Sequence, residues 1–463
     1  MSKVLPAFAA CSGGLGVIVL SVTTHSAFAQ QQQQQGALTT ASILSDVEWN
    51  DNYNLSTDSP GDALIWDTVL LLGLERRTLV DTLVASLEGT FRVSDVPITG
   101  TDYTTDNPTA VLLYDRVVGD DALTFGARYQ RADVAFFDPL SDIDPFGNFD
   151  DTFGDGTRES ARANVGIDLN QQGPVSFAFD AATFQVNYFD TNDPSLNDRT
   201  INTSAANFGF QLTPTLQMLV GGVYNFSTFD NATDTERTTT AADVGFAAQL
   251  NPRLDSTLRI GYSEVVADRT TGRDTQEGVV GSFNLTALQQ NGQISAGFAA
   301  TLNENGERYN ATVGKVINWQ NSSLSANIGA TASADTQARP IGDITYVYNL
   351  PRTTVSFGLR QFSSVDDDGN DTLNSYVNAA VRHAITPVSA VSLILSGGLQ
   401  RFEDTNRQDS ERANFTAIYT RALTQDWDMN FGYRGRYRNQ ENSGEATSNA
   451  VFIGVQRDFV SIR

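Results

Sequence analysis

Apolar and polar residues alternate along most of this chain. In the segment from Trp427 to Arg438, aromatic side chains occupy one side of an extended strand, whereas Arg434, Arg436 and Arg438 occupy the other. Because alternate residues of a strand point to opposite faces, each such segment has one apolar face and one wet face. The recurring pattern predicts an all-β fold: a single transmembrane antiparallel up-and-down β-barrel of about 22 strands, with about 20 as the nearest alternative.

Compact turns and longer acidic connectors alternate between these segments. Turn signals such as Gly173-Pro174, Thr213-Pro214 and Asn251-Pro252 stand about 40 residues apart, a spacing that fits two strands and one loop. Short turns at one rim and longer loops at the other are typical of barrels in the outer membrane of Gram-negative bacteria. We therefore expect outer-membrane lipids, lipopolysaccharide and the barrel-assembly machinery as partners.

Residues 1–29 have the features of a signal peptide. Lys3 precedes a small and apolar stretch, and Ala27-Phe28-Ala29 forms a small-x-small pattern, so we expect cleavage between Ala29 and Gln30. Residues 30–42 contain a polyglutamine run and are expected to form a flexible periplasmic tail, with the barrel over residues 43–463. Such a tail is too short to fold into a plug. The sequence therefore predicts a barrel without a plug domain and disfavours energy-coupled uptake.

The composition disfavours several classes of function. The formal net charge is −24, which would repel the phosphates of a nucleic acid. His25 and Cys11 lie within the expected signal peptide, which leaves His383 as the one histidine of the mature chain. A histidine-based hydrolase or a His/Cys metal cluster would need more of these residues. We expect no enzymatic activity, no cofactor and no metal centre.

One acidic hairpin, Asp366 to Asp371, superficially resembles a calcium-binding loop. Loops of this class carry a bidentate Glu at their twelfth position. If Ser364 is the first residue, Ser375 occupies the twelfth. The sequence therefore predicts a solvated hairpin tip.

Strand parity separates the residues that face lipid from those that face the lumen. Val244, Phe246 and Leu258 fall on apolar faces and are expected to contact lipid. The charged residues on the opposite faces are predicted to line the pore: Asp46, Glu48, Glu88, Arg128, Arg162, Asp168, Asp243, Arg259, Arg360, Arg382, Arg434, Arg436 and Arg438. Closure of the barrel would place the last three arginines two strands from Asp46 and Glu48. These charges either set a field across the pore or neutralise one another in water.

The longest connector, residues 138–156, is a candidate constriction loop. It combines three phenylalanines with a series of aspartates, so aromatic rings would dock it on the inner wall while carboxylates face the passage. An ordinary external loop is the alternative. The residues concerned are Asp138, Asp142, Asp144, Phe146, Phe149, Asp150, Asp151, Phe153 and Asp155.

Two segments near the start carry a resemblance to a known family. Asp46-Val-Glu-Trp-Asn-Asp-Asn-Tyr-Asn54 and Leu70-Leu-Leu-Gly-Leu-Glu-Arg-Arg-Thr78 resemble the start of the β-barrel porin 2-like family of proteobacterial outer-membrane proteins. The resemblance implies an outer-membrane barrel of largely unestablished activity and supplies no catalytic residues. Many such barrels end on an aromatic residue that the assembly machinery recognises, whereas here Phe459 is followed by four more residues.

These features together favour a passive, porin-like channel for small solutes or ions. The alternative is a non-enzymatic surface or export barrel, with a role in polysaccharide passage, envelope organisation or adhesion. A homo-oligomer is compatible with either function, because porins often associate through their outer walls.

Overall fold

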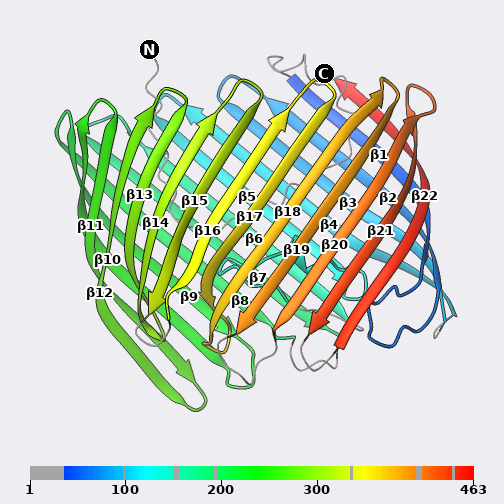
Figure 1. The fold of residues 1–463 in the computed structure, drawn as a ribbon, viewed down its shortest axis with the longest axis horizontal. Helices are drawn as coiled ribbons and strands as arrows, with labels where there is room; N and C mark the ends of the chain where they lie inside the picture. Colours follow the sequence, from blue (N-terminus) through cyan, green and yellow to red (C-terminus); the bar gives the residue numbers. More distant parts are fainter. Residues whose placement is uncertain are drawn as a thin grey trace.

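The computed structural model describes residues 36–97, 100–150, 156–191, 196–333, 337–402, 409–440 and 444–462. Antiparallel strands form a closed barrel, which Figure 1 shows from the side. The strands of the described residues are β1 (Gly36–Asn50), β2 (Ala63–Arg77), β3 (Asp81–Val96), β4 (Gly100–Val118), β5 (Asp121–Asp133), β6 (Thr157–Leu169), β7 (Val175–Phe189), β8 (Arg199–Thr213), β9 (Leu216–Phe229), β10 (Thr235–Asn251), β11 (Leu254–Arg269), β12 (Gly272–Gln289), β13 (Gly292–Asn303), β14 (Gly306–Asn318), β15 (Ser322–Ser333), β16 (Arg339–Asn349), β17 (Thr353–Val365), β18 (Asp371–Thr386), β19 (Ser389–Phe402), β20 (Ser410–Ala422), β21 (Trp427–Gln440) and β22 (Gly444–Ile462).

Pairing of β1 with β22 closes the sheet. The two strands are antiparallel in the register Leu38↔Ile462 to Asn50↔Ala450, and each remaining strand pairs with its sequence neighbours. A closed sheet has no edge whose backbone groups would be left unpaired in lipid. The predicted all-β antiparallel barrel of 22 strands is confirmed.

The first strand starts earlier than the sequence pattern indicates. It begins at Gly36, which pairs with Arg77 of β2, rather than at Ile43. The residues from Leu38 onward also pair with β22. Residues 36–42, which we expected in a flexible tail, therefore belong to the barrel wall.

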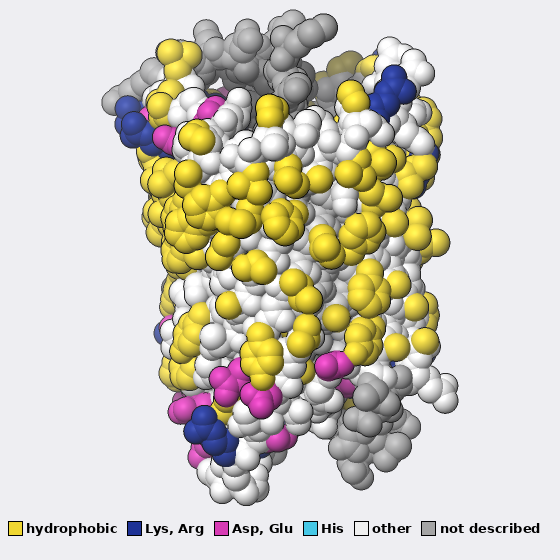
Figure 2. All heavy atoms as spheres, turned by 90° about the vertical axis from the view of Figure 1, so that its left-hand side faces the viewer, with side chains coloured by type: hydrophobic (Ala, Val, Ile, Leu, Met, Phe, Trp, Pro, Cys, Tyr) yellow, Lys and Arg dark blue, Asp and Glu magenta, His cyan; other side chains and the backbone are white. Residues whose placement is uncertain are grey.

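The predicted faces of the strands are confirmed. Val244, Phe246 and Leu258 are exposed on the outside, and on the face drawn in Figure 2 hydrophobic side chains form an apolar belt between the two rims, most densely in its upper part. Charged and amide side chains occupy the alternate, inward positions. Among the described residues, no helix is long and apolar enough to span a membrane.

The two rims of the barrel differ. Short turns join the strands at the rim where β1 begins and β22 ends, and longer loops lie at the other rim (Figure 1). In outer-membrane barrels the terminal rim is periplasmic and the longer loops are extracellular. Closure, the apolar belt and this asymmetry together indicate the outer membrane of a Gram-negative bacterium.

Candidate functional site

The loop after β5 crosses the lumen at its extracellular end. It leaves the wall at β5 and β6 and reaches the inner faces of β17, β18 and β19. Since β6 and β18 are twelve positions apart in a ring of 22 strands, these walls lie opposite each other. The hydroxyl of Tyr376 donates a hydrogen bond of 2.6 Å to the carbonyl oxygen of Gly147, which fixes the loop to the far wall.

Asn148 supplies further contacts between the loop and the far wall. Its side-chain oxygen accepts hydrogen bonds from Ser364 at 3.0 Å, from Asn374 at 3.1 Å and from Gln400 at 3.3 Å. Three strands therefore supply donors to one amide oxygen. Phe149 beside it is only 4% exposed and meets the ring of Tyr376 edge-on.

Two glycines make this close approach sterically feasible. Gly147 has a positive φ of 89°, and a Cβ there would lie 2.1 Å from the Phe362 ring. A Cβ on Gly398 of β19 would lie 2.6 Å from Leu140 and 3.2 Å from Phe149. Side chains at either position would displace the loop from the wall.

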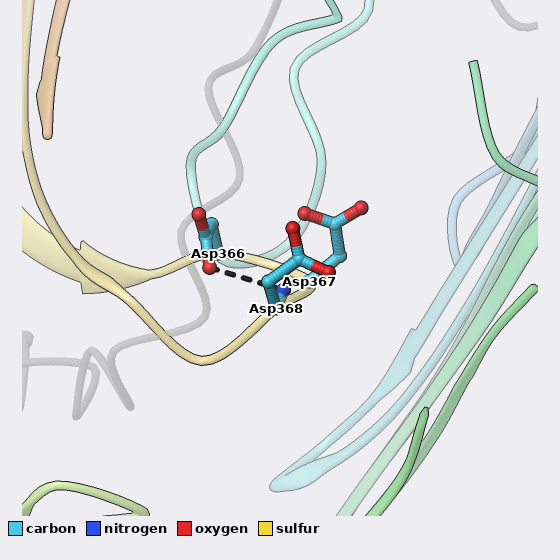
Figure 3. Close-up of side chains that lie close together, drawn as sticks. All are labelled: Asp366, Asp367 and Asp368. Carbon is cyan, nitrogen blue, oxygen red and sulfur yellow. Dashed lines mark hydrogen bonds between the residues drawn. The ribbon is translucent and has the colours of Figure 1, made fainter. Parts of the chain in front are cut away.

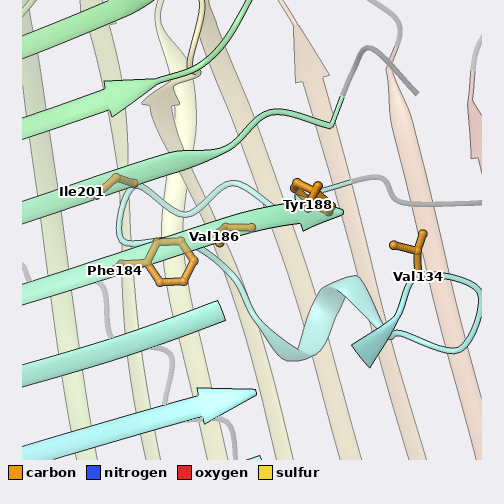
Figure 4. Close-up of a cluster of buried hydrophobic side chains, with 5 residues drawn as sticks. All are labelled: Val134, Phe184, Val186, Tyr188 and Ile201. Atoms are coloured by element: carbon orange, nitrogen blue, oxygen red, sulfur yellow. The ribbon is translucent and has the colours of Figure 1, made fainter. Parts of the chain in front are cut away.

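An apolar cluster holds the other end of the loop. Val134, Phe184, Val186, Tyr188 and Ile201 are buried together where the loop leaves β5 (Figure 4). Phe146 and Leu196 pack against this cluster. A short 3₁₀ helix, η2 (Pro139–Ser141), shapes the connecting segment.

Buried ion pairs neutralise the carboxylates of the loop. Arg158 and Arg162 bind Asp142 at 2.6 and 2.8 Å. Arg199 binds both oxygens of Asp150, at 2.6 and 2.9 Å, and Arg158 lies 3.3 Å from the same carboxylate. Such pairs offset the cost of burying the charges only when both partners remain.

The pKa values of these carboxyls follow from their surroundings. Burial alone would raise the pKa of Asp150, but the guanidinium groups of Arg199 and Arg158 outweigh burial and hold it below its usual range. Burial would also raise the pKa of Asp142, but the guanidinium groups of Arg158 and Arg162 outweigh burial, so the pKa of Asp142 is lowered. Asp144 is different, because burial dominates there and raises its pKa.

The loop between β17 and β18 also folds into the lumen. Asn231 of the β9–β10 loop donates to Asp368 at 2.7 Å, and Asn305 of the β13–β14 loop donates to the Gly369 carbonyl at 2.8 Å. Arg237 of β10 donates to the Asp366 carbonyl at 2.9 Å and pairs with Glu304. The β17–β18 loop is therefore held by residues at the extracellular ends of β9, β10, β13 and β14.

The acidic triplet of this loop is folded against the wall. Asp366, Asp367 and Asp368 have carboxylate oxygens within 4.8 Å of one another, and the Asp366 carboxylate accepts a bond from the Asp368 amide (Figure 3). Asp366 and Asp371 are only 4% and 6% exposed. The predicted solvated hairpin tip is therefore only partly correct, because Asp366 is buried while Asp367 and Asp368 remain partly exposed.

The predicted constriction loop is located inside the barrel, but its carboxylates are not arranged as expected. Phe149 docks on the far wall as predicted, while Asp142, Asp144 and Asp150 are buried or ion-paired rather than facing a passage. Asp138 stays exposed and accepts a bond of 2.8 Å from Asn414 of β20. Asp151, Phe153 and Asp155, like the cleavage residues Ala29 and Gln30, lie outside the described residues.

The predicted pore-lining residues occupy inward positions of their strands. Arg434 and Glu48 form an ion pair of 2.7 Å across β22, which confirms that the arginine series lies near the start of the chain. Arg259 and Asp243 pair at 2.6 Å. The others in inward register are Asp46, Glu88, Arg128, Arg162, Asp168, Arg360, Arg382, Arg436 and Arg438. That they line a solute path remains a prediction.

The sequence did not predict the residues that hold the β5–β6 loop in the lumen. Arg158, Arg199, Asn148 and Tyr376 carry most of the contacts described above, yet no periodic pattern distinguishes them from other inward residues. A second buried network, in which Arg92 pairs with Asp67 at 2.8 Å and Asp106 at 2.7 Å, was missed for the same reason. The sequence feature that could have indicated these buried networks is the number of arginines at inward-facing positions of the strands.

Comparison with known proteins identifies the fold. No protein-family model matches the sequence, and no curated protein matches it. The FrpB iron transporter of Neisseria meningitidis is similar in structure. Its F5-1 variant in the apoprotein form has a TM-score of 0.54 and its F3-3 variant one of 0.53, each at 10% identity over 93% of this chain and 82% of that chain. A mutant ferric enterobactin receptor of Pseudomonas aeruginosa gives a TM-score of 0.47 at 8% identity, over 92% and 82%.

The structural likeness to FrpB shows a shared barrel fold, and the predicted porin 2-like family is not confirmed. The prediction of a passive, porin-like channel is overturned. FrpB, whose barrel is similar, is described as an iron transporter, and two loops of this chain extend into the lumen. The alternative of a surface or export barrel gains no support from these neighbours.

Proposed function

We propose that this chain is an outer-membrane receptor and transporter for a small solute, whose lumen is closed at rest by its own loops. The observation that carries the proposal is the β5–β6 loop, which is bound to both walls. Tyr376 and Asn148 hold it at the far wall, and Arg158 and Arg199 hold it at the near one.

The contacts are suited to a reversible closure. A barrel this wide would leave a large hole if its loops pointed outward. The β5–β6 loop is held to the far wall by hydrogen bonds between neutral groups, each of which contributes about 0.5–1.5 kcal/mol to stability. A solute that binds better to the open arrangement would shift the population toward it.

An iron-bearing solute is the first substrate class to test. FrpB, which shares the barrel, is described as an iron transporter. The inner wall of this chain carries Arg434 and Arg436 toward the extracellular end. Arg434 is partly exposed to the lumen beside its partner Glu48, and Arg436 donates to the Tyr53 carbonyl at 2.5 Å. Guanidinium groups suit an anionic iron chelate.

Three finer statements belong to the same proposal. The described loops take the place of a separate plug domain, the protein acts without enzymatic chemistry, and residues 1–29 are removed on export. Membership of the porin 2-like family, the small-solute partners and a homo-oligomeric state are likewise retained as predictions.

Uptake of radioactive iron tests the proposal. Cells that lack the chain would be compared with cells that express it, using ferric citrate and a ferric catecholate as probes. Expression should increase the accumulation of at least one chelate while leaving that of free glucose unchanged. Equal accumulation of both chelates with and without the chain would contradict an iron-bearing substrate, and equal uptake of glucose and chelate would indicate nonspecific leakage.

A further inference from the structure

The outer wall carries two arginines at the periplasmic rim that form no ion pair among the described residues. Arg457 of β22 and Arg421 of β20 both point outward, on either side of β21. Trp427, the first residue of β21, pairs directly with Arg457 and follows the periplasmic turn 423–426. Aromatic residues in this position mark the membrane–water interface, so the arginines lie at the level of the inner-leaflet headgroups.

Two aromatic rings hold the Arg457 guanidinium in place. Its central carbon lies 4.6 Å from the centre of the Phe459 ring and 5.4 Å from that of Trp427. Cation–π contacts of this kind orient the group without neutralising its charge. The Nε atom is buried and has no hydrogen-bond partner within the part of the chain that the structure describes.

The nearby carboxylates do not compensate these charges. Asp426 lies in the turn next to Trp427, and among the described residues its side chain forms no ion pair with either arginine. Asp458 lies on the inward face of β22 and accepts a hydrogen bond of 2.9 Å from Gln456. By contrast, Arg116 elsewhere on the same rim has a carboxylate partner, because its Nε lies 3.8 Å from an oxygen of Asp81. Two positive charges at the headgroup level are therefore left without a carboxylate partner among the described residues.

We propose that Arg457 and Arg421, with Trp427 and Phe459, form a binding site for the phosphodiester headgroup of an anionic glycerophospholipid of the inner leaflet. Planar guanidinium groups match phosphate oxygens, which would accept hydrogen bonds from the terminal nitrogens of Arg457 and Arg421. Two positive charges favour a headgroup with a net negative charge over a zwitterionic one. The rings would contact the glycerol and upper acyl region, as interfacial aromatic residues do.

Native mass spectrometry of the intact protein tests this site with phosphatidylglycerol as the probe and phosphatidylcholine as the zwitterionic comparison. The wild-type protein should retain at least one phosphatidylglycerol molecule. Arg457→Gln should weaken its apparent affinity roughly fivefold, the effect expected of one arginine at an anionic surface. The double variant with Arg421→Gln should weaken it further, and Arg116→Gln on the same rim should leave it unchanged.

Each other outcome overturns the proposal. Equal retention of both lipids, or an unchanged affinity in Arg457→Gln, would show that these arginines do not select an anionic headgroup. Full competition by inorganic phosphate would indicate a site for a free anion. A dimer that dissociates in Arg457→Gln would show that the anion comes from a second protein chain. Heat-modifiable migration of each variant confirms that it has folded before its lipids are measured.

Discussion

The hydroxyl of Tyr376 on β18 donates a hydrogen bond of 2.6 Å to the carbonyl oxygen of Gly147 in the loop after β5. The two residues are 229 positions apart in sequence and belong to opposite sides of the barrel. This contact holds the loop across the lumen, which the proposed closure requires.

Removing the Tyr376 hydroxyl should loosen the closure without altering the wall. Tyr376→Phe keeps the ring that Phe149 packs against but loses one hydrogen bond, which costs about 1 kcal/mol. The fraction of time spent in a conducting state should rise about fivefold in planar bilayers, as expected from an energy of this size. Tyr309→Phe is the matched control, since Tyr309 bonds to Glu307 on the outward face. An identical effect of both substitutions would count against the loop contact.

Breaking a buried ion pair should destabilise the loop end far more than breaking an exposed pair. Arg199→Ala leaves Asp150 without its bidentate partner and should cost about 3–5 kcal/mol, as for other buried pairs. The comparison is Arg273→Ala, whose partner Asp268 lies 3.6 Å away in an exposed pair, with an expected cost of about 0–1 kcal/mol. Urea unfolding of the lipid-embedded protein measures both. Equal costs would mean that Arg199 does not anchor the loop.

The closure should withstand mild acid. The lowered pKa values of Asp142 and Asp150 mean that their contribution is complete above the unfolded value of about 4 and is lost only as the pH falls through the lower folded values. The raised pKa of Asp144 has the opposite effect on stability. The folded loop binds this proton more readily than the unfolded chain does, so it gains stability as the pH falls. Conductance should therefore not increase between about pH 7 and about pH 5. An increase over that interval in the wild-type protein, but not in Asp144→Asn, would contradict this assignment.

The lipid-facing register can be tested by arginine substitution. Phe246→Arg or Leu258→Arg should impair folding by roughly 2–4 kcal/mol if the site is near the bilayer midplane. Thr257→Arg, next to Leu258 but inward, should be tolerated. Asp243 also faces inward but is a poorer control. It pairs with Arg259 at 2.6 Å, and an arginine at position 243 would repel that partner. Folding yield into lipid vesicles separates the faces, and equal losses at residues 257 and 258 would refute the register.

The wall of the barrel was predictable from sequence, whereas its closure was not. Alternation such as that around Phe246 encodes which face meets lipid, since the side-chain period of a strand is two. The start at Gly36 was missed because small and polar residues there carry no alternation, and pairing with β2 and β22 determines the strand instead.

The inward course of the loops depends on contacts between distant segments. Asn148 meets Asn374, 226 positions later, and nothing local in either segment signals the other. Gly398 is the sequence feature that is linked to the docked loop, because its lack of a side chain makes room for Leu140 and Phe149. The aspartates of the loop suggested a polar passage, but burial beside Arg158 and Arg199 turns them into structural ion pairs.

A disulfide that locks the loop tests the central claim most directly. The Ser364 hydroxyl lies 3.0 Å from the Asn148 side-chain oxygen, so Asn148→Cys with Ser364→Cys places two thiols at this contact, and the natural Cys11 lies in the predicted signal peptide. Each single variant serves as a control, and the gel mobility of the oxidised and reduced protein verifies the bond. Iron-chelate uptake should be lost in oxidised cells expressing the double variant and restored by reduction. Equal uptake with the bond formed and broken would contradict a transporter whose β5–β6 loop must leave the far wall.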